Sequence, residues 1–409
     1  MDKPRLRPLE VLPIQHQGRT ALLLRDPLGY SEAVLLLAPE AFYLISHFDG
    51  EHTVREAQVA FLRRYGQLVM SHQIEALIQQ LDEALFLDNE RFRRHREAME
   101  ASFRNSPVRS ASHAGRSYPE EEGELRALLE SFFLHPRGPG RFPQRQGKPL
   151  SGLIAPHIDF QRGGHAYAWA YFALGEAEPA DLFVVMGTGH AARDRFVLTV
   201  KDFETPLGVV PTAKDLVQSL AERLPWSPFE EEWIHKGEHS LEFQVLWLAH
   251  LLGTRGDYEI LPILLGSFED LLHGSASPLE QDERLRRFCE ALTEVLAASG
   301  RRACFIASVD FAHMGTRFGD QQRMTAEFLA WLRRQDQETL RLLAEHDAEG
   351  FYRHLARDRN RRRLDGLATL YVMLQVLPPS KGEVLCYDQA VDSQEHSVVS
   401  FASMVYRPE

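Results

Sequence analysis

Hydrophobic positions in the last three quarters of the chain alternate between short continuous runs and longer stretches of helical period. The short runs are Leu150–Ala155, Leu182–Met186, Tyr258–Leu265 and Ala303–Ala307, of which Leu182–Met186 is apolar throughout. Runs that are apolar throughout are typical of buried parallel strands. The helical period predicts helices at Gly164–Leu174, Lys214–Arg223, Leu241–Leu252 and Leu285–Ser299. Strands that alternate with helices predict an α/β fold with a mainly parallel sheet flanked by helices.

Two later segments, Gly382–Tyr387 and Ser397–Tyr406, read as strands, and we expect them to pair. Together these elements define a domain over residues 106–409. Residues 88–108 are charged and then Ser-rich, which predicts a linker in front of this domain.

The first hundred residues follow a different pattern and predict a separate small α+β module, residues 1–100. Short strands are expected at Ala21–Leu24 and Ala33–Leu37, followed by a helix over Glu40–Phe48 that Pro39 opens. Thr53 and Glu56 form a capping box for a second helix, which Gly66 ends, and Ser71 is expected to cap a third. Short helices between short strands predict a winged-helix shape.

Composition and charge narrow the classes of function. The 409 residues carry a formal net charge of −12, which argues against a nucleic-acid or membrane-surface partner. The Arg-rich stretches Arg91–Arg96 and Arg357–Arg363 are interpreted as solvated surface. Three cysteines without a CxxC pair predict a reducing compartment. Neither a secretory signal nor a membrane-length apolar run is visible, so we expect a cytoplasmic protein.

Histidines follow three of the expected strands. His157, His190 and His313 each come within a few residues of the end of an apolar run. Parallel strands end at the same edge of a sheet, and ligands bind beyond that edge. Imidazoles are common ligands of iron, zinc and copper. The pattern therefore predicts a mononuclear metal site built from these three histidines.

Other polar residues near these strand ends are candidates for catalytic roles. The segment GEHSLEFQ places Glu238 and His239 just before a helix. His239 is a candidate acid or base and Glu238 its orienting partner, although an ordinary helix start would look the same. Asp310, which follows the same apolar run as His313, is the third candidate catalytic residue.

The N-terminal module resembles the PqqD-like family in LAPEAFYLISHFDGEHTVREA and QIEALIQQLDEALFL. Members of that family bind leader peptides of ribosomally made natural products. The resemblance implies a winged-helix fold and a peptide partner. A winged helix that packs on the main domain or on another protein is the alternative.

A second set of motifs runs through the larger domain: RSASHAGRSYP, APHIDFQRGGHAYAWAY, VVMGTGH, TPLG, GEHSLEFQ, ILPILLG, ASVDFAHMGTRFG and YDQAVDSQEHSVVSFAS. From Ser106 to Tyr406 the chain thereby resembles the Memo family, also called AmmeMemoRadiSam system protein B. That family is similar to class III extradiol dioxygenases, which hold a non-heme iron. The resemblance implies that His157, His190 and His313 stand at metal-ligand positions. It also implies radical SAM and AMMECR-type proteins as pathway partners.

The chain departs from this family pattern at several positions. The family often carries a Cys before its late helix, where this chain has DRNRRRLDGLATL, and Ala312 replaces another common Cys. Within that stretch Asp365 is interpreted mainly as part of an Asp–Gly turn, with a place near the site as the alternative. Asp159, two residues after His157, could orient that ring, ligate or face solvent.

These observations leave three hypotheses open. The first is a metal-dependent, dioxygenase-like redox enzyme acting on a small-molecule or peptide substrate. The second is a non-catalytic protein that binds metal or a partner. The third is a zinc-type metallohydrolase, since a bound ion can lower the pKa of water toward neutrality. The expected cofactor is a divalent metal ion, iron before copper or zinc.

Overall fold

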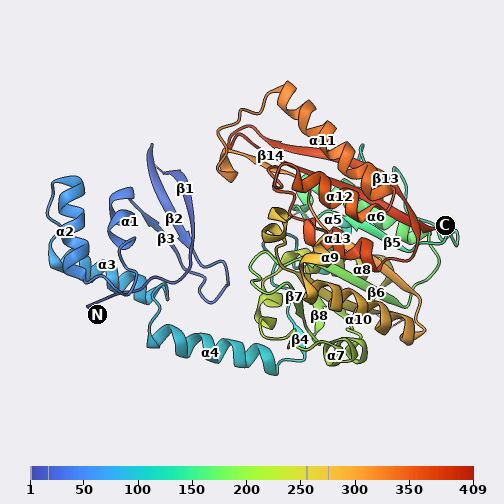
Figure 1. Ribbon diagram of the computed structural model, residues 1–409, viewed down its shortest axis with the longest axis horizontal. Coiled ribbons are helices and arrows are strands. Elements are labelled where there is room, and N and C mark those ends of the chain that lie inside the picture. Colours follow the sequence, from blue (N-terminus) through green and yellow to red (C-terminus); the bar gives the residue numbers. More distant parts are fainter. Residues whose placement is uncertain (1, 17, 255–256, 275) are drawn as a thin grey trace. The chain divides into compact units, whose positions relative to one another are not determined.

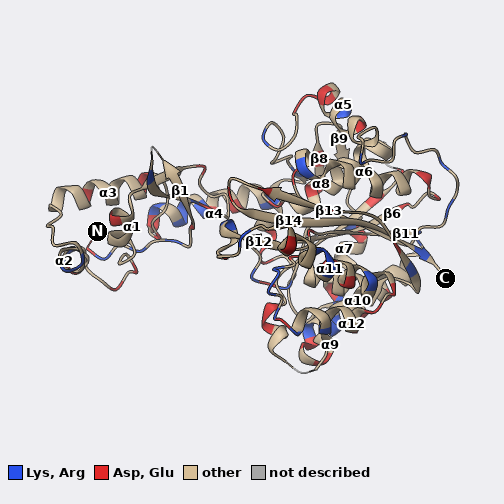
Figure 2. Cartoon of the chain, turned by 90° about the horizontal axis from the view of Figure 1, so that it is seen from above, with Lys and Arg blue, Asp and Glu red and all other residues tan. Residues whose placement is uncertain are grey.

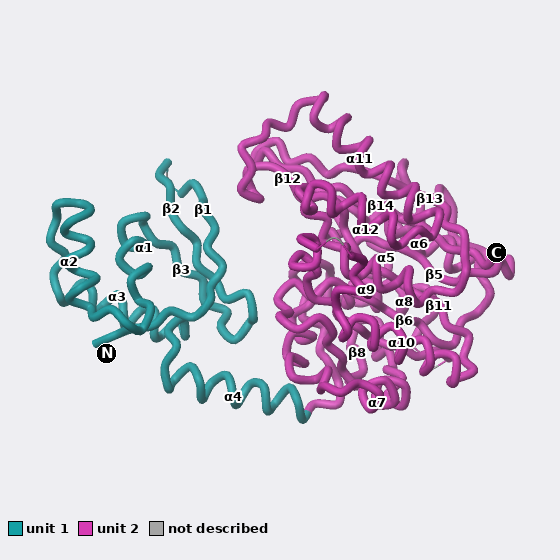
Figure 3. Tube along the Cα trace, viewed as in Figure 1, with its two compact units in different colours: residues 1–105 teal, residues 106–409 magenta. Residues whose placement is uncertain are grey.

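The chain divides into two compact units, Met1–Asn105 and Ser106–Glu409 (Figure 3). The computed structural model describes residues 2–16, 18–254, 257–274 and 276–409. In the cartoon of Figure 2, positions of Lys and Arg and positions of Asp and Glu are interspersed along the helices of both units. None of the helices in these described ranges combines the length and the hydrophobicity that a membrane crossing requires.

Unit 1 is an antiparallel sheet with helices after it in the chain (Figure 1). Its strands lie in the order β1-β2-β3. The elements are β1 (Glu10–His16), β2 (Arg19–Arg25), β3 (Val34–Leu37), α1 (Pro39–Ile45), α2 (Val54–Tyr65), α3 (Ser71–Glu83) and α4 (Glu90–Asn105). Its core joins Leu24 and Leu37 of the sheet to Leu44, Phe61 and Leu81 of the helices. The winged-helix shape and the peptide partner stay predictions.

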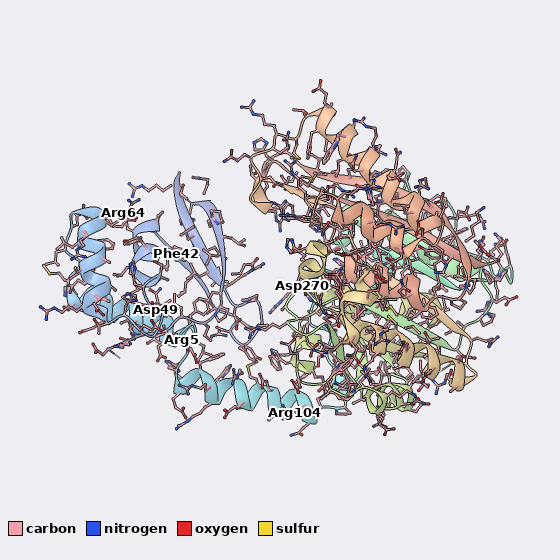
Figure 4. All side chains as sticks on the ribbon, in the orientation of Figure 1. Arg5, Phe42, Asp49, Arg64, Arg104 and Asp270 are labelled. Atoms are coloured by element: carbon pink, nitrogen blue, oxygen red, sulfur yellow. The ribbon has the colours of Figure 1, made fainter. Side chains whose placement is uncertain are left out.

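Local signals explain most of unit 1. The capping box of Thr53 and Glu56 opens α2, and Gly66 ends it with φ 68°. The prediction for α3 was wrong by one residue, because Met70 is the N-cap and Gln73 bonds back to its backbone. Near the N-terminus, the backbone of Arg5 forms an isolated antiparallel β-bridge with that of Asp49, and both residues are labelled in Figure 4.

The expected linker contains the helix α4, which the sequence interpretation missed. Asn89 accepts a hydrogen bond from Phe92 N (3.0 Å) at its start. The buried Phe92 ring packs edge-on against Tyr30, with centroids 5.7 Å apart, and Arg7 lies over it. The helix is thus fixed by contacts with distant residues of its own unit, which a composition pattern does not reveal.

Unit 2 contains a large mixed sheet, in which eight strands of the described chain take part. The order is β12-β14-β5-β11-β6-β10-β7, with β13 paired to β14. These strands are β5 (Gly152–Ala155), β6 (Leu182–Thr188), β7 (Phe196–Leu198), β10 (Glu259–Leu265), β11 (Ala303–Ser308), β12 (His313–Gly315), β13 (Ser380–Asp392) and β14 (Ser397–Pro408). The α/β prediction is confirmed, and so is the pairing of the last two strands. Only β5, β11, β6 and β10 are mutually parallel, and the outer strands pair antiparallel.

Helices cover both faces of this sheet (Figure 1). The longer ones are α5 (Glu122–Phe133), α6 (Phe160–Glu176), α7 (Lys214–Arg223), α8 (His239–Leu252), α10 (Glu283–Ser299), α11 (Ala326–Ala344), α12 (Ala348–Ala356) and α13 (Leu367–Val376). The shorter ones are α9 (Pro278–Gln281) and the 3₁₀ turns η1 (Glu232–Lys236), η2 (Glu269–His273) and η3 (Thr316–Phe318). Along β6, Val184 and Met186 pack with α7, α10, α12 and α13, and Phe183 and Val185 pack with α5, α6 and α8. A strand buried on both faces explains the continuous apolar run in the sequence.

A small second sheet lies in the same unit. It contains β4 (Val108–Arg109), β8 (Asp202–Thr205) and β9 (Gly208–Val210), in that order. β4 pairs parallel with β8, so the first residues of unit 2 are fixed to its body.

The interpretation of Arg357–Arg363 as solvated surface was wrong for two residues, because Asn360 and Arg362 are buried. The Arg362 side chain is 1% exposed and pairs with the equally buried Asp336. Asp336 also accepts hydrogen bonds from Tyr387 (2.9 Å) and Ser400 (2.6 Å). The Arg362 carbonyl accepts the backbone N–H of His313 (2.8 Å), so this buried pair also anchors the strand end at β12.

We expect Arg362→Ala to destabilise the protein by about 3–5 kcal/mol, because it leaves the Asp336 carboxylate buried without its counter-ion. Arg361→Ala is the matched control: this neighbouring side chain is exposed, and its removal should change stability by about 0.5 kcal/mol or less. Urea unfolding followed by circular dichroism measures both. Equal stability of the two variants would contradict the assigned role of the buried pair.

Candidate metal centre

Three parallel strands end side by side and place the candidate residues at one edge of the sheet. Ser308 of β11 pairs with Ala155 of β5 on one side and Gly187 of β6 on the other. His157 follows β5, His190 follows β6, and Asp310 and His313 follow β11. The expected convergence of strand ends is therefore present, and side-chain directions decide which groups meet.

The His157 ring is buried, with one hydrogen-bond acceptor at each nitrogen. Its Nδ1 lies 3.1 Å from the carbonyl of Ser308, and its Nε2 lies 2.7 Å from Oδ2 of Asp365. Burial lowers the pKa of His157, but the carboxylates of Asp365 and Asp310 outweigh it and raise that pKa to about 9. A pKa of about 9 favours the protonated form of this ring at neutral pH.

His190 likewise has an acceptor oxygen facing each of its ring nitrogens. Its Nδ1 lies 3.1 Å from both carboxylate oxygens of Glu238, and its Nε2 lies 3.6 Å from Oδ2 of Asp365. Burial lowers its pKa, and Glu238 and Asp365 raise it well above the ordinary value. The two imidazoles therefore present their Nε2 atoms to one carboxylate oxygen.

Glu238 orients two histidines with one buried carboxylate. Besides His190 it contacts Nδ1 of His239 at 3.2 Å, and it accepts the backbone N–H of His190 (3.0 Å) and of Ser240 (2.9 Å). It is also the N-cap residue of α8. Burial raises its pKa, but His190 holds that pKa well below the ordinary value. Burial lowers the pKa of His239, which keeps this ring neutral near pH 7.

Within the described residues, His157, His190 and His239 form a group whose potential ligand atoms all lie within 4.8 Å of one another. The ring centroids of His239 lie 4.8 Å from His190 and 5.2 Å from His157. His313 is not in this group. Its Nδ1 faces the carbonyls of Phe311 and Arg363, both at 3.2 Å.

The carboxylates of Asp310 and Asp159 each accept hydrogen bonds from backbone N–H groups. Asp310 accepts the N–H groups of His157 (3.0 Å) and Ile158 (3.1 Å) and lies 3.9 Å from Nε2 of His157. Asp159 caps α6 and pairs with Arg162. Asp310 is thus placed to position His157, and Asp159 to start a helix.

Asp365 is the residue of this cluster that sequence reasoning undervalued. It lies between the two imidazoles rather than only in a surface turn, and its pKa is lowered, because His157 and His190 outweigh the effect of burial. The loop before it contains Arg359, Asn360 and Arg363 at positive φ, a conformation that is unusual outside glycine. The one signal for Asp365 in the sequence was its place in the stretch where the family pattern often has a Cys.

Comparison with known proteins identifies the larger unit. The family model described as Memo-like protein matches residues 109–405. The chain belongs to the Memo family. A MEMO1 family protein of Aquifex aeolicus is 29% identical over 408 residues, covering 99% of this chain and all of that protein. One from Thermus thermophilus is 30% identical over 357 residues, 86% of this chain and 98% of its own length.

Other Memo relatives correspond to less of the chain. A MEMO1 family protein of Methanopyrus kandleri is 27% identical over 306 residues, which are 99% of its length and 73% of this chain. The Memo family therefore includes proteins whose full length matches both units together and proteins that match only part of this chain.

The electrostatics of His157 predict how stability varies with pH. Its pKa is raised from 6.5 to about 9 on folding. The stabilisation is therefore complete below pH 6.5 and disappears as the pH rises through 9. With a chelator present, we expect the thermal midpoint to fall over this range, and His157→Gln to show a smaller fall. Differential scanning calorimetry measures both, and parallel curves for the two proteins would contradict the charged state of this ring.

Proposed function

We propose that this Memo-family protein is a non-heme iron oxidoreductase of dioxygenase-like chemistry, with His157, His190 and Asp365 as the metal ligands. The observation that carries the proposal is the meeting of two Nε2 atoms at Oδ2 of Asp365, 2.7 and 3.6 Å away. Two imidazoles and one carboxylate are the ligand set of non-heme Fe(II) oxygenases.

The hydrogen bonds around these side chains support a cation at this position. Both Nε2 atoms face Oδ2 of the same carboxylate, so an ion placed there would meet two nitrogen donors and one oxygen donor. The Nδ1 atoms would keep their acceptors, the Ser308 carbonyl and Glu238. Ligating histidines almost always have such an acceptor behind them.

The chemistry of the donors favours iron over softer metals. The proposed ligands are nitrogen and oxygen atoms, whereas Cu(I) and structural zinc sites favour thiolates. Cys289 and Cys304 are buried in the hydrophobic cores on either face of the sheet. Asp365 therefore supplies a hard donor where the family pattern often has sulfur.

Bound iron would supply open coordination positions at which a small organic substrate and dioxygen meet. His239 is placed to move protons there, since Glu238 holds its Nδ1 and its ring packs against His157 and His190. A neutral His239 can accept a hydroxyl proton from the substrate at Nε2. Its side chain is 32% exposed and that of His190 40%, so access is from their side.

Metal content after anaerobic purification tests the ligand assignment. We expect about one iron per chain in the wild type and at least tenfold less in His190→Ala and in Asp365→Ala, because each removes a ligand. His313→Ala is the comparison variant and should keep its iron, since its Nδ1 faces backbone carbonyls. Circular dichroism checks that every variant is folded.

Three results of that experiment would overturn the proposal. Iron retained by Asp365→Ala removes the carboxylate from the ligand set. Iron lost from His190→Ala and His313→Ala but kept by Asp365→Ala restores the set of three histidines expected from the sequence. Zinc in the purified protein together with hydrolysis of simple esters assigns the site to a metallohydrolase instead.

Exchanging the carboxylate for a thiolate should change metal preference. We expect Asp365→Cys to bind Zn(II) over Fe(II) with a ratio at least tenfold higher than that of the wild type, because sulfur is the softer donor. Competition between the two ions, followed by elemental analysis, measures the ratio. Asp365→Glu is the control that keeps an oxygen donor, and an unchanged ratio in the Cys variant would contradict ligation by residue 365.

A further inference from the structure

The chain segment Arg109–His113, called the strap below, binds the loop that carries Glu238 and His239. The loop runs from the end of η1, where the last backbone carbonyls lack helical partners, to the start of α8. Four consecutive carbonyls of this loop accept hydrogen bonds from the strap, as follows: His235 from Arg109 Nε (2.7 Å), Lys236 from Ser112 Oγ, Gly237 from His113 Nε2 (3.0 Å) and Glu238 from Arg109 Nη2 (2.9 Å).

The strap is itself fixed by a buried carboxylate on α8. Glu242, 1% exposed, pairs with the fully buried Arg109. It also accepts the backbone N–H of Ser112 (3.2 Å) and of His113 (2.9 Å), and the hydroxyl of Tyr118. Burial raises the pKa of Glu242, but the charge of Arg109 and the hydrogen bonds to this carboxylate together outweigh burial, and the pKa lies below its ordinary value. The strap therefore follows the first turn of α8 as one unit.

One strap side chain packs against a histidine of the proposed centre. The ring of His113 lies edge-on to that of His239, with centroids 5.8 Å apart, and to that of Phe243, at 5.7 Å. The ring centroids of Phe243 and His239 lie 5.4 Å apart. His239 thus contacts Glu238, Phe243 and His113. Its ring also packs against those of His157 and His190.

We propose that His113 is a positioning residue of the metal centre, acting through the 235–238 loop on Glu238 and His239. The inference rests on the proposed function, because it assigns the strap to the same site. His113 fixes the Gly237 carbonyl and one side of the His239 ring. Without it, Glu238 is less constrained, and so is the His190 ring that Glu238 orients. The family match begins at Arg109, so the strap lies within the Memo region.

Binding of Co²⁺, as a spectroscopic substitute for Fe²⁺, tests this proposal on the full chain. We expect His113→Ala to weaken Co²⁺ binding about tenfold, the lower end of the effect of residues behind metal ligands. Its visible absorption bands should also shift, because the ligand geometry changes. His113→Gln keeps a donor for the Gly237 carbonyl and should recover most of the affinity.

His273→Ala is the matched control, since His273 is an exposed histidine of the same unit, at the end of η2. It should leave affinity and spectrum unchanged. The thermal midpoint of His113→Ala should stay within about 2 °C of the wild type, since this partly exposed side chain contributes little to stability.

The outcomes separate the two proposals. A wild type that binds Co²⁺ with an affinity and spectrum that His113→Ala shares overturns the role of His113 alone. A wild type that binds no Co²⁺ overturns the proposed function, and this inference with it. A weakened His113→Ala that His113→Gln does not recover, together with a large loss of thermal stability, assigns His113 to folding and overturns the positioning role.

Discussion

The side-by-side pairing of β5, β11 and β6 is the constraint on which the candidate centre depends. Ser308 lies between Ala155 and Gly187 in this register. A shift by one residue would turn each following side chain to the other face of the sheet. The hydrophobic layers on both faces, which include Val184 and Val185 of β6, prevent that shift. The positions of His157 and His190 thus follow from core packing.

Carboxylates then decide what those histidines can do. Asp365 meets both Nε2 atoms, Glu238 holds His190 and His239 from behind, and Asp310 binds the backbone at His157. Buried carboxylates are tolerated only with such partners, because an unpaired charge is costly away from water. The same requirement recurs at Arg362 and Asp336, and at Arg109 and Glu242. Each buried pair joins segments far apart in the chain around the strand ends.

The strap lies near the start of unit 2 in the sequence. Helix α4 of unit 1 ends at Asn105, and Arg109 follows after three residues. The strap is therefore the first part of the Memo region after unit 1. A relative from Aquifex aeolicus aligns over nearly the whole chain, whereas one from Methanopyrus kandleri matches about three quarters of it.

The sequence by itself determined the α/β class, the central strands, the first three helices of unit 1, α6, α7, α8 and α10 of unit 2, and the histidines beyond β5 and β6. Periodicity and caps are local signals, which is why these features could be predicted. Only the tertiary structure decided that Asp365, 208 residues after His157, meets its ring, and that His239 rather than His313 joins the histidine group. Two further features also emerged only from the structure: Arg362 is buried, and α4 forms where the sequence predicted a linker. Each of these depends on contacts between distant segments, and a local pattern carries no record of which distant side chain will face it.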